Sequence, residues 1–205
     1  ARGAAIDWHD LIADTKRTIA DTSQAAEVGR IIREIPDGEG SAFEDDEEAR
    51  EAIAELLAAF GVYRAYLPAG AEHLAAAVDA ASARRPDLDL ALASVARLIR
   101  RDPHGAFARR FMQTTGPVMA KGVEDRAFYR YGRLTSLTEV GGDPSQFSRT
   151  PASFHDALAG RQAAWPRAMT TLTTHDTKRS EDVRARLAVL AEKAEMWAQA
   201  LRNLR

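Results

Sequence analysis

The densest group of residues able to do chemistry is the stretch TTLTTHDTKRSED at 170–182. It brings a His-Asp pair, His175 and Asp176, next to two cationic side chains, Lys178 and Arg179. A carboxylate beside an imidazole can stabilise a developing cation, accept a proton or bind a metal. The spacing leaves these roles open, and an ordinary polar loop before a helix is an equally good interpretation.

The residues on either side predict that this stretch joins a strand to a helix. Residues 170–174 are four Thr and one Leu, and β-branched side chains favour strands. Ser180 is a good N-cap, and apolar residues then recur at helical spacing through Leu187 and Leu190. Such a loop opens at the carboxyl end of a strand, where α/β barrels place their catalytic groups.

A second group of charged and aromatic residues lies upstream, in QTTGPVMAKGVEDRAFYRY at 113–131. Lys121, Glu124 and Asp125 would lie within one or two turns of one another on a helix. Taken alone, they are a solvated network of i, i+3 and i, i+4 charge pairs.

Together the two segments resemble the maltooligosyltrehalose synthases, a family of the α-amylase superfamily, glycoside hydrolase family 13. The strings KGVED, AFYRY, LTEVGGDP, FH, WP and THDTKRSEDVRARL occur in the order that the family shows. The resemblance covers about 111–190 and, more loosely, the N-terminal half, where GVYRAYLP at 61–68 is similar. These isomerases convert the reducing-end α-1,4 linkage of a maltooligosaccharide to an α,α-1,1 linkage, giving a maltooligosyl trehalose.

The resemblance also implies roles for single residues. Asp176 matches the third carboxylate of the superfamily, which would hold the 2- and 3-hydroxyls of a distorted sugar ring, with His175 hydrogen-bonding beside it. Lys178 and Arg179 would border the reducing-end subsites. The expected sugar-facing positions of the upstream segment are Lys121, Glu124, Tyr129 and Tyr131.

The chain departs from the family pattern in two ways. No segment before Phe111 resembles the nucleophile or general-acid motif, and Gly132 and Met112 stand where Asn and Gln are expected. We therefore expect a piece of the enzyme that carries one of three catalytic carboxylates, is inactive alone, and has the remainder of the parent enzyme as its partner. No cofactor or metal is expected.

Two other classes of protein fit parts of the sequence. His-Asp occurs also at His9-Asp10 and His155-Asp156, and helical metal-dependent phosphohydrolases hold divalent metals with such pairs. That class sets its pair within a helix, whereas His175-Asp176 follows a predicted strand. The third class, a structural helical module without a ligand, is the favoured interpretation of the first hundred residues.

Composition limits the remaining possibilities. The 205 residues are 45% hydrophobic and 28% charged, with a net charge of −2, which gives no reason to expect nucleic acid or an anionic membrane as partner. The chain has no Cys, no apolar run long enough for a membrane span and no signal-peptide pattern at its start. We expect a cytoplasmic protein.

Abundant Ala and the apolar periodicity predict a mainly α fold: a helical insertion region at 1–105, then a piece of a (β/α)8 barrel at 106–205 with at most a few short strands. The predicted helices are 6–20, one ending at Pro36, one opened by the acidic run 44–48, 71–83, 88–101, one starting at Asp102-Pro103 and running toward 113, 118–134, 153–164 and one or two within 180–204. Residues 62–67 and 170–174 are predicted as strands or extended segments, 114–117 as a break and 135–150 as a long loop.

Overall fold

The computed structural model describes residues 6–174, 177 and 179–204. It divides into two compact units, Ala1–Arg130 (unit 1) and Tyr131–Arg205 (unit 2). Both units are helical, and the described residues contain no strand, which confirms the predicted mainly α class. The strand predicted at 170–174 is therefore wrong, and 62–67, predicted as a strand or an extended segment, is not a strand; both segments are irregular.

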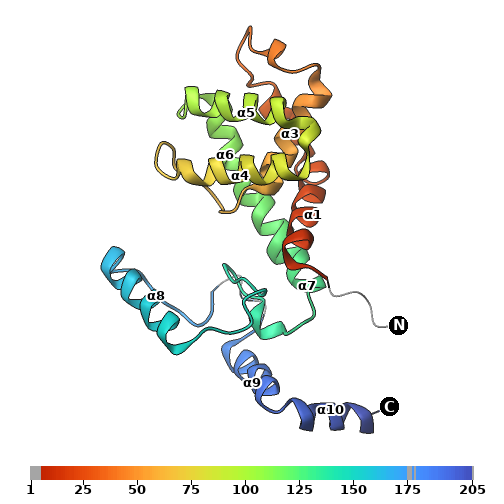
Figure 1. The fold of residues 1–205 in the computed structure, drawn as a ribbon, viewed down its shortest axis with the longest axis vertical. Helices are drawn as coiled ribbons and strands as arrows, with labels where there is room; N and C mark the ends of the chain where they lie inside the picture. Colours follow the sequence, from red (N-terminus) through yellow and green to blue (C-terminus); the bar gives the residue numbers. More distant parts are fainter. Residues whose placement is uncertain (1–5, 175–176, 178, 205) are drawn as a thin grey trace. The chain divides into compact units, whose positions relative to one another are not determined.

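Unit 1 is built from helices joined by short turns and by two longer connections, 33–45 and 60–70 (Figure 1). The helices are α1 (Trp8–Asp21), α2 (Ala25–Ile32), α3 (Asp46–Ala59), α4 (Ala71–Arg84), α5 (Asp89–Arg101), α6 (Ala106–Met119), the π-helical η3 (Ala120–Ala127) and α7 (Phe128–Arg130). Two 3-10 turns, η1 (Gly40–Ala42) and η2 (Pro86–Leu88), complete it.

Helix starts in unit 1 follow local chemistry. The Asp7 side chain accepts a hydrogen bond from the backbone N–H of Asp10, and Asp45 accepts from those of Glu47 and Glu48. The acidic first turn of α3 also opposes the positive end of its helix dipole. These ends therefore need no tertiary contact to be specified.

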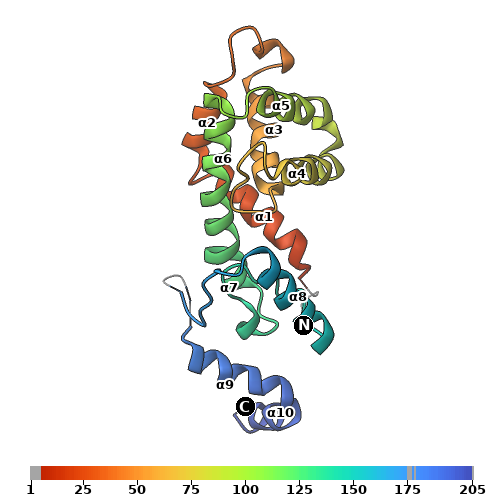
Figure 2. The ribbon, with the colours of Figure 1, turned by 90° about the vertical axis from the view of Figure 1, so that its left-hand side faces the viewer.

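Helix α3 lies at the centre of the core and is flanked by α1, α2, α4, α5 and α6 (Figure 2). Its residues 52–58 are all buried, so it is covered on every side rather than along one stripe. The core also takes apolar side chains from α5 and α6, including Leu92, Ile99 and Phe111.

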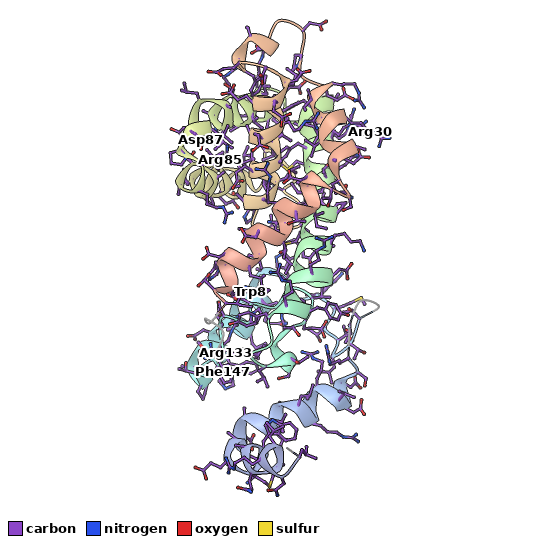
Figure 3. All side chains as sticks on the ribbon, turned by 90° about the vertical axis from the view of Figure 1, so that its right-hand side faces the viewer. Trp8, Arg30, Arg85, Asp87, Arg133 and Phe147 are labelled. Atoms are coloured by element: carbon purple, nitrogen blue, oxygen red, sulfur yellow. The ribbon has the colours of Figure 1, made fainter. Side chains whose placement is uncertain are left out.

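An ion-pair network covers one side of this core. Buried Glu55 accepts hydrogen bonds from Arg17 of α1 and Arg84 of α4, each at 3.1 Å. Glu51, one turn earlier, accepts from Arg17 at 2.6 Å and from Arg85 at 3.0 Å. The network ties α1, α3 and the end of α4 together; its Arg85 also pairs with Asp87 of η2 (Figure 3).

The break predicted at 114–117 is wrong, because α6 continues through Pro117 and passes directly into η3 and α7. Packing overrides the local signals here. Thr114 and Thr115 are buried, and their hydroxyls donate to the carbonyls of Arg110 and Met112. The Thr115 hydroxyl also lies 2.7 Å from the Tyr63 carbonyl, which joins the helix to the segment before α4.

The start predicted for this helix is also wrong. Asp102 is the C-cap of α5, with its N–H directed to the Leu98 carbonyl, and α6 begins only after Gly105. The Asp-Pro pair therefore ends one helix and turns the chain toward the next. Both errors come from reading local signals without the packing that surrounds them.

Unit 2 consists of η4 (Thr135–Leu137), α8 (Pro151–Ala164), α9 (Glu181–Glu192) and α10 (Ala194–Asn203). The N-cap of α8 is Thr150, which accepts from the Ser153 N–H, rather than Ser153 as its sequence suggests. The region 180–204 forms two abutting helices that meet at Lys193, one of the two predicted forms.

None of α8, α9 and α10 buries a side chain among the residues described. Large apolar groups stay exposed on or near them, notably Trp165, Met169 and Leu204. Residues 170–174 form no strand because the described residues offer no neighbouring strand to pair with their N–H and C=O groups.

The boundary between the units lies at 130/131, whereas the sequence predicted domains 1–105 and 106–205. Helix α6 packs against α2, α3 and α5, so 106–130 shares the core of unit 1. Which residues belong to a barrel in a longer protein stays a prediction. No helix in the described ranges is long and apolar enough to cross a membrane.

Candidate functional site

The π-helical segment η3 carries two of the predicted sugar-facing residues. Lys121 is exposed and pairs with Asp125, with 2.8 Å between Nζ and Oδ2. Glu124, three residues on, is only 4% exposed. Short π-helical stretches are rare and occur often at functional sites, so the local geometry fits a site, although the sugar contacts themselves stay predictions.

Helix α1 packs closely on this segment at Gly122. A Cβ atom at Gly122 would lie 2.6 Å from Cγ and 2.8 Å from Cα of Lys16. Lys16 is itself buried, and its ammonium group donates to the carbonyl of Phe60 at the C-terminus of α3. Burial lowers the pKa of Lys16 from 10.5 to about 7, because removal from water disfavours the charged form.

Aromatic stacking holds α7, the helical turn that follows η3, against α1. The rings of Trp8 and Phe128 are stacked, with 5.6 Å between centroids and 8° between planes. Phe128 is buried, whereas the neighbouring Tyr129 is 63% exposed and open to a ligand. Tyr131, the first residue of unit 2, is buried.

The predicted catalytic pair, His175 and Asp176, and the neighbouring Lys178 lie outside the described residues. On either side of the pair in sequence, Thr174 and Thr177 bond to each other: the Thr174 N–H donates to the Thr177 hydroxyl at 2.7 Å. Arg179 is described and half-buried.

Two residues that the sequence did not single out support this loop. Arg184 of α9 donates to the carbonyl of Leu172 at 3.3 Å and pairs with Glu139 at 2.9 Å. Glu139 lies in the LTEVGGDP string and Arg184 in the THDTKRSEDVRARL string, but the family resemblance implied no role for either residue. The pair connects α9, the segment after η4 and the approach to His175.

The start of α9 carries a perturbed carboxylate. The Ser180 hydroxyl donates to Asp182, and together with the backbone N–H of Val183 this lowers the pKa of the Asp182 carboxyl. The Ser180 side chain makes no capping bond to the backbone, so it serves Asp182 instead. Negative charge in a first helical turn is also favoured by the dipole.

The segment similar to the family at 61–68 lines a pocket of about 430 Å³ in unit 1. Its floor is apolar and buried, and exposed Arg64, Tyr66, His104 and Arg109 stand around it. The guanidinium of Arg64 lies 5.1 Å from the centre of the Tyr66 ring. The sequence did not single out His104 and Arg109, because nothing in their spacing connects them to Tyr66.

Among the residues with described positions, no three His, Asp or Glu side chains come together in a way that could hold a metal ion. The additional His-Asp pairs, His9-Asp10 and His155-Asp156, lie on α1 and α8.

Comparisons with known proteins decide between the classes that the sequence left open. No family profile matches the chain. A curated Mycobacterium tuberculosis protein named "Putative maltooligosyl trehalose synthase" is 41% identical over 199 residues, which is 96% of this chain and 25% of that protein. The structure of maltooligosyltrehalose synthase from Arthrobacter ramosus is 49% identical, with a TM-score of 0.89, over 98% of this chain and 26% of that one.

The chain is homologous to about one quarter of a maltooligosyl trehalose synthase. A more distant structure, that of a hypothetical maltooligosyl trehalose synthase of Sulfolobus tokodaii, is 27% identical, with a TM-score of 0.66, over 98% of this chain and 25% of that one. The chain thus spans about a quarter of the length of the relatives it matches, in agreement with the expected piece of a synthase. Neither the phosphohydrolase nor the purely structural module is favoured by these matches.

Proposed function

We propose that this chain is part of an enzyme that converts the reducing-end α-1,4 linkage of maltooligosaccharides to an α,α-1,1 linkage by intramolecular transglucosylation. The observation that carries the proposal is the match to the Arthrobacter ramosus synthase, at 49% identity and a TM-score of 0.89 over 98% of the chain. The chain alone is inactive, because it carries one catalytic carboxylate, Asp176, and the reaction needs three.

In this proposal Asp176 holds the 2- and 3-hydroxyls of the sugar ring, and His175 hydrogen-bonds beside it. Enzymes that retain configuration pass through an oxocarbenium-like transition state between two carboxyl groups about 5 Å apart. Hydrogen bonds to ring hydroxyls that strengthen as the ring distorts lower the barrier further. The nucleophile and the general acid come from the remainder of the parent enzyme, which is the partner of this chain.

The remaining site residues bind the glucan rather than break it. Aromatic faces pack on sugar rings and charged groups hydrogen-bond hydroxyls, which suits exposed Tyr129 and Lys121. Lys178 and Arg179 border the reducing end. Glu124 and Tyr131, which are buried in this structure, are the other residues predicted to contact the glucan. The substrate is uncharged and the chain carries a net charge of only −2, so long-range electrostatic steering is not needed.

The proposal places the protein in trehalose biosynthesis, in glycoside hydrolase family 13 and in the cytoplasm. A chain without Cys is compatible with a reducing compartment. No cofactor is required, since the reaction exchanges one glycosidic bond for another.

The decisive test replaces Asp176 with Asn in a full-length enzyme that contains this chain. We expect the rate at which maltopentaose is converted to a trehaloside to fall about a thousandfold or more. The substitution removes a transition-state contact and keeps the fold. Asp156→Asn is the matched control, because Asp156 also follows a His but lies on the exposed helix α8. An undiminished rate in Asp176→Asn would remove this residue from the mechanism.

A further inference from the structure

Gly122 lies so close to helix α1 that a residue with a Cβ atom would not fit there. A Cβ atom there would lie 2.6 Å, 2.8 Å and 3.0 Å from Cγ, Cα and the backbone nitrogen of Lys16. Two of these three atoms belong to the backbone of a helix and cannot rotate away. Any side chain at Gly122 must therefore push η3 and α1 apart.

Lys16 links this contact to a third element. Its backbone meets Gly122, while its ammonium group reaches the carbonyl of Phe60, which caps α3 at the end where the helix dipole favours a cation. A Lys that is 3% exposed is costly, and its pKa near 7 reflects that cost. An apolar residue would fill the same space at a lower desolvation cost, but it could not donate a hydrogen bond to the Phe60 carbonyl of α3.

A second contact holds the other end of the segment. Gly122 is near the start of η3, and Phe128 follows its last residue and stacks on Trp8 near the start of α1. The residues between these two contacts are wound as a π-helix, which is less favourable than an α-helix. Relaxation to an α-helix would rotate Phe128 relative to Gly122, and both contacts to the same rigid helix prevent that rotation.

We propose that Lys16, Gly122 and the Trp8–Phe128 stack are positioning residues that hold η3 in its π-helical form and thereby set the direction of the exposed Lys121 toward the glucan. The positioning role rests on the proposed function, because it assumes that Lys121 contacts the substrate. The contacts themselves are independent of it.

The structural part of the inference is tested on the 205-residue chain with Gly122→Ala. Trp8 is 4% exposed, whereas Trp165 and Trp197 are 74% and 42% exposed, so the quencher-protected part of the tryptophan fluorescence reports on Trp8. We expect this protected part to be lost and the amides of 120–127 to exchange about tenfold faster or more. Gly29→Ala is the control: Gly29 is also helical, and a Cβ there meets nothing closer than 3.8 Å.

The positioning part is tested with the same two variants in a full-length enzyme that contains this chain. Gly122→Ala should lower kcat/KM for maltopentaose about tenfold to a hundredfold, mainly through KM, with helix content unchanged, whereas Gly29→Ala should leave it unaltered. If Trp8 and the amide exchange do not respond to Gly122→Ala, the inference is overturned.

If they respond but kcat/KM does not, the contacts are structural only and the positioning role is overturned. Failure of the proposed function is a different result, because the unaltered full-length enzyme would then form no trehaloside. In that event Trp8 and the amides of 120–127 still decide whether Lys16 and Gly122 fix the segment.

Discussion

Units 1 and 2 are both helical but differ in what stabilises their helices. In unit 1 the helix α3 is buried on all sides and the surrounding helices share one core. In unit 2 the helices α8, α9 and α10 bury no described side chain, and Met169 is 99% exposed. Local signals such as the Thr150 cap can set helix boundaries in both units, but only unit 1 has the burial that makes a fold stable.

The difference shows which part of a homologous segment is self-sufficient. Exposed apolar groups on α8–α10 are typical of a surface that another part of a protein covers. The matched relatives are about four times longer than this chain, since it covers 25% of their length. We expect unit 2 to need the remainder of a parent enzyme for its stability, and unit 1 to need nothing beyond itself.

The largest effect is expected when the two units are separated. A protein ending at Arg130 should unfold cooperatively on heating and keep its helical circular dichroism, because the core lies within 6–130. Residues 131–205 alone should show no cooperative transition, since burial is too small to offset the loss of chain entropy. Cooperative melting of the 131–205 peptide would show that the comparison is wrong.

The next effect comes from one substitution made in each unit. Glu55→Ala removes the buried carboxylate that Arg17 and Arg84 share, and we expect the free energy of unfolding to fall by about 1.5–3 kcal/mol, because both arginines keep another carboxylate partner. Glu139→Ala removes the partly exposed pair with Arg184 and should cost less than about 1 kcal/mol. Urea denaturation followed by circular dichroism measures both, and equal costs would contradict the contrast between the units.

The last prediction concerns pH and Lys16, whose effect is at most about 1.4 kcal/mol per pH unit. Its pKa is about 7 in the folded protein and near 10.5 when unfolded, so between these values only the unfolded chain holds the proton. Stability therefore rises as pH rises from 7 toward 10, by up to a few kcal/mol on the order given by the shift. Lys16→Met should flatten that rise in urea denaturation midpoints.

The control for this prediction is Lys121→Met, because Lys121 is exposed and its loss should leave the rise intact. A rise of the same size in the Lys16→Met protein would show that other groups cause the pH dependence.

Much of unit 1 could be predicted from sequence, because its helix ends are marked locally. The helix predicted at 6–20 is α1, which begins two residues later, and the helices predicted at 71–83 and 88–101 differ from α4 and α5 by one residue at one end. The failures lie where packing opposes a local signal. Pro117 predicts a break, yet the buried Thr115 and its bond to Tyr63 keep the helix continuous.

The candidate site divides in the same way. Family strings identified Lys121 and Glu124, but no sequence pattern shows that η3 is π-helical or that Gly122 meets Lys16, since both depend on helices far apart in the chain. The Thr-rich segment at 170–174 favoured a strand by residue type, but a strand requires partners, and the described residues supply none. His175, Asp176 and Lys178 stay predictions.

The stack of Trp8 on Phe128 has a consequence for how unit 1 opens. It joins residues that are 120 positions apart, so the two rings close a loop that contains the core of unit 1. Parting the rings would release both ends of that loop while leaving the core itself assembled.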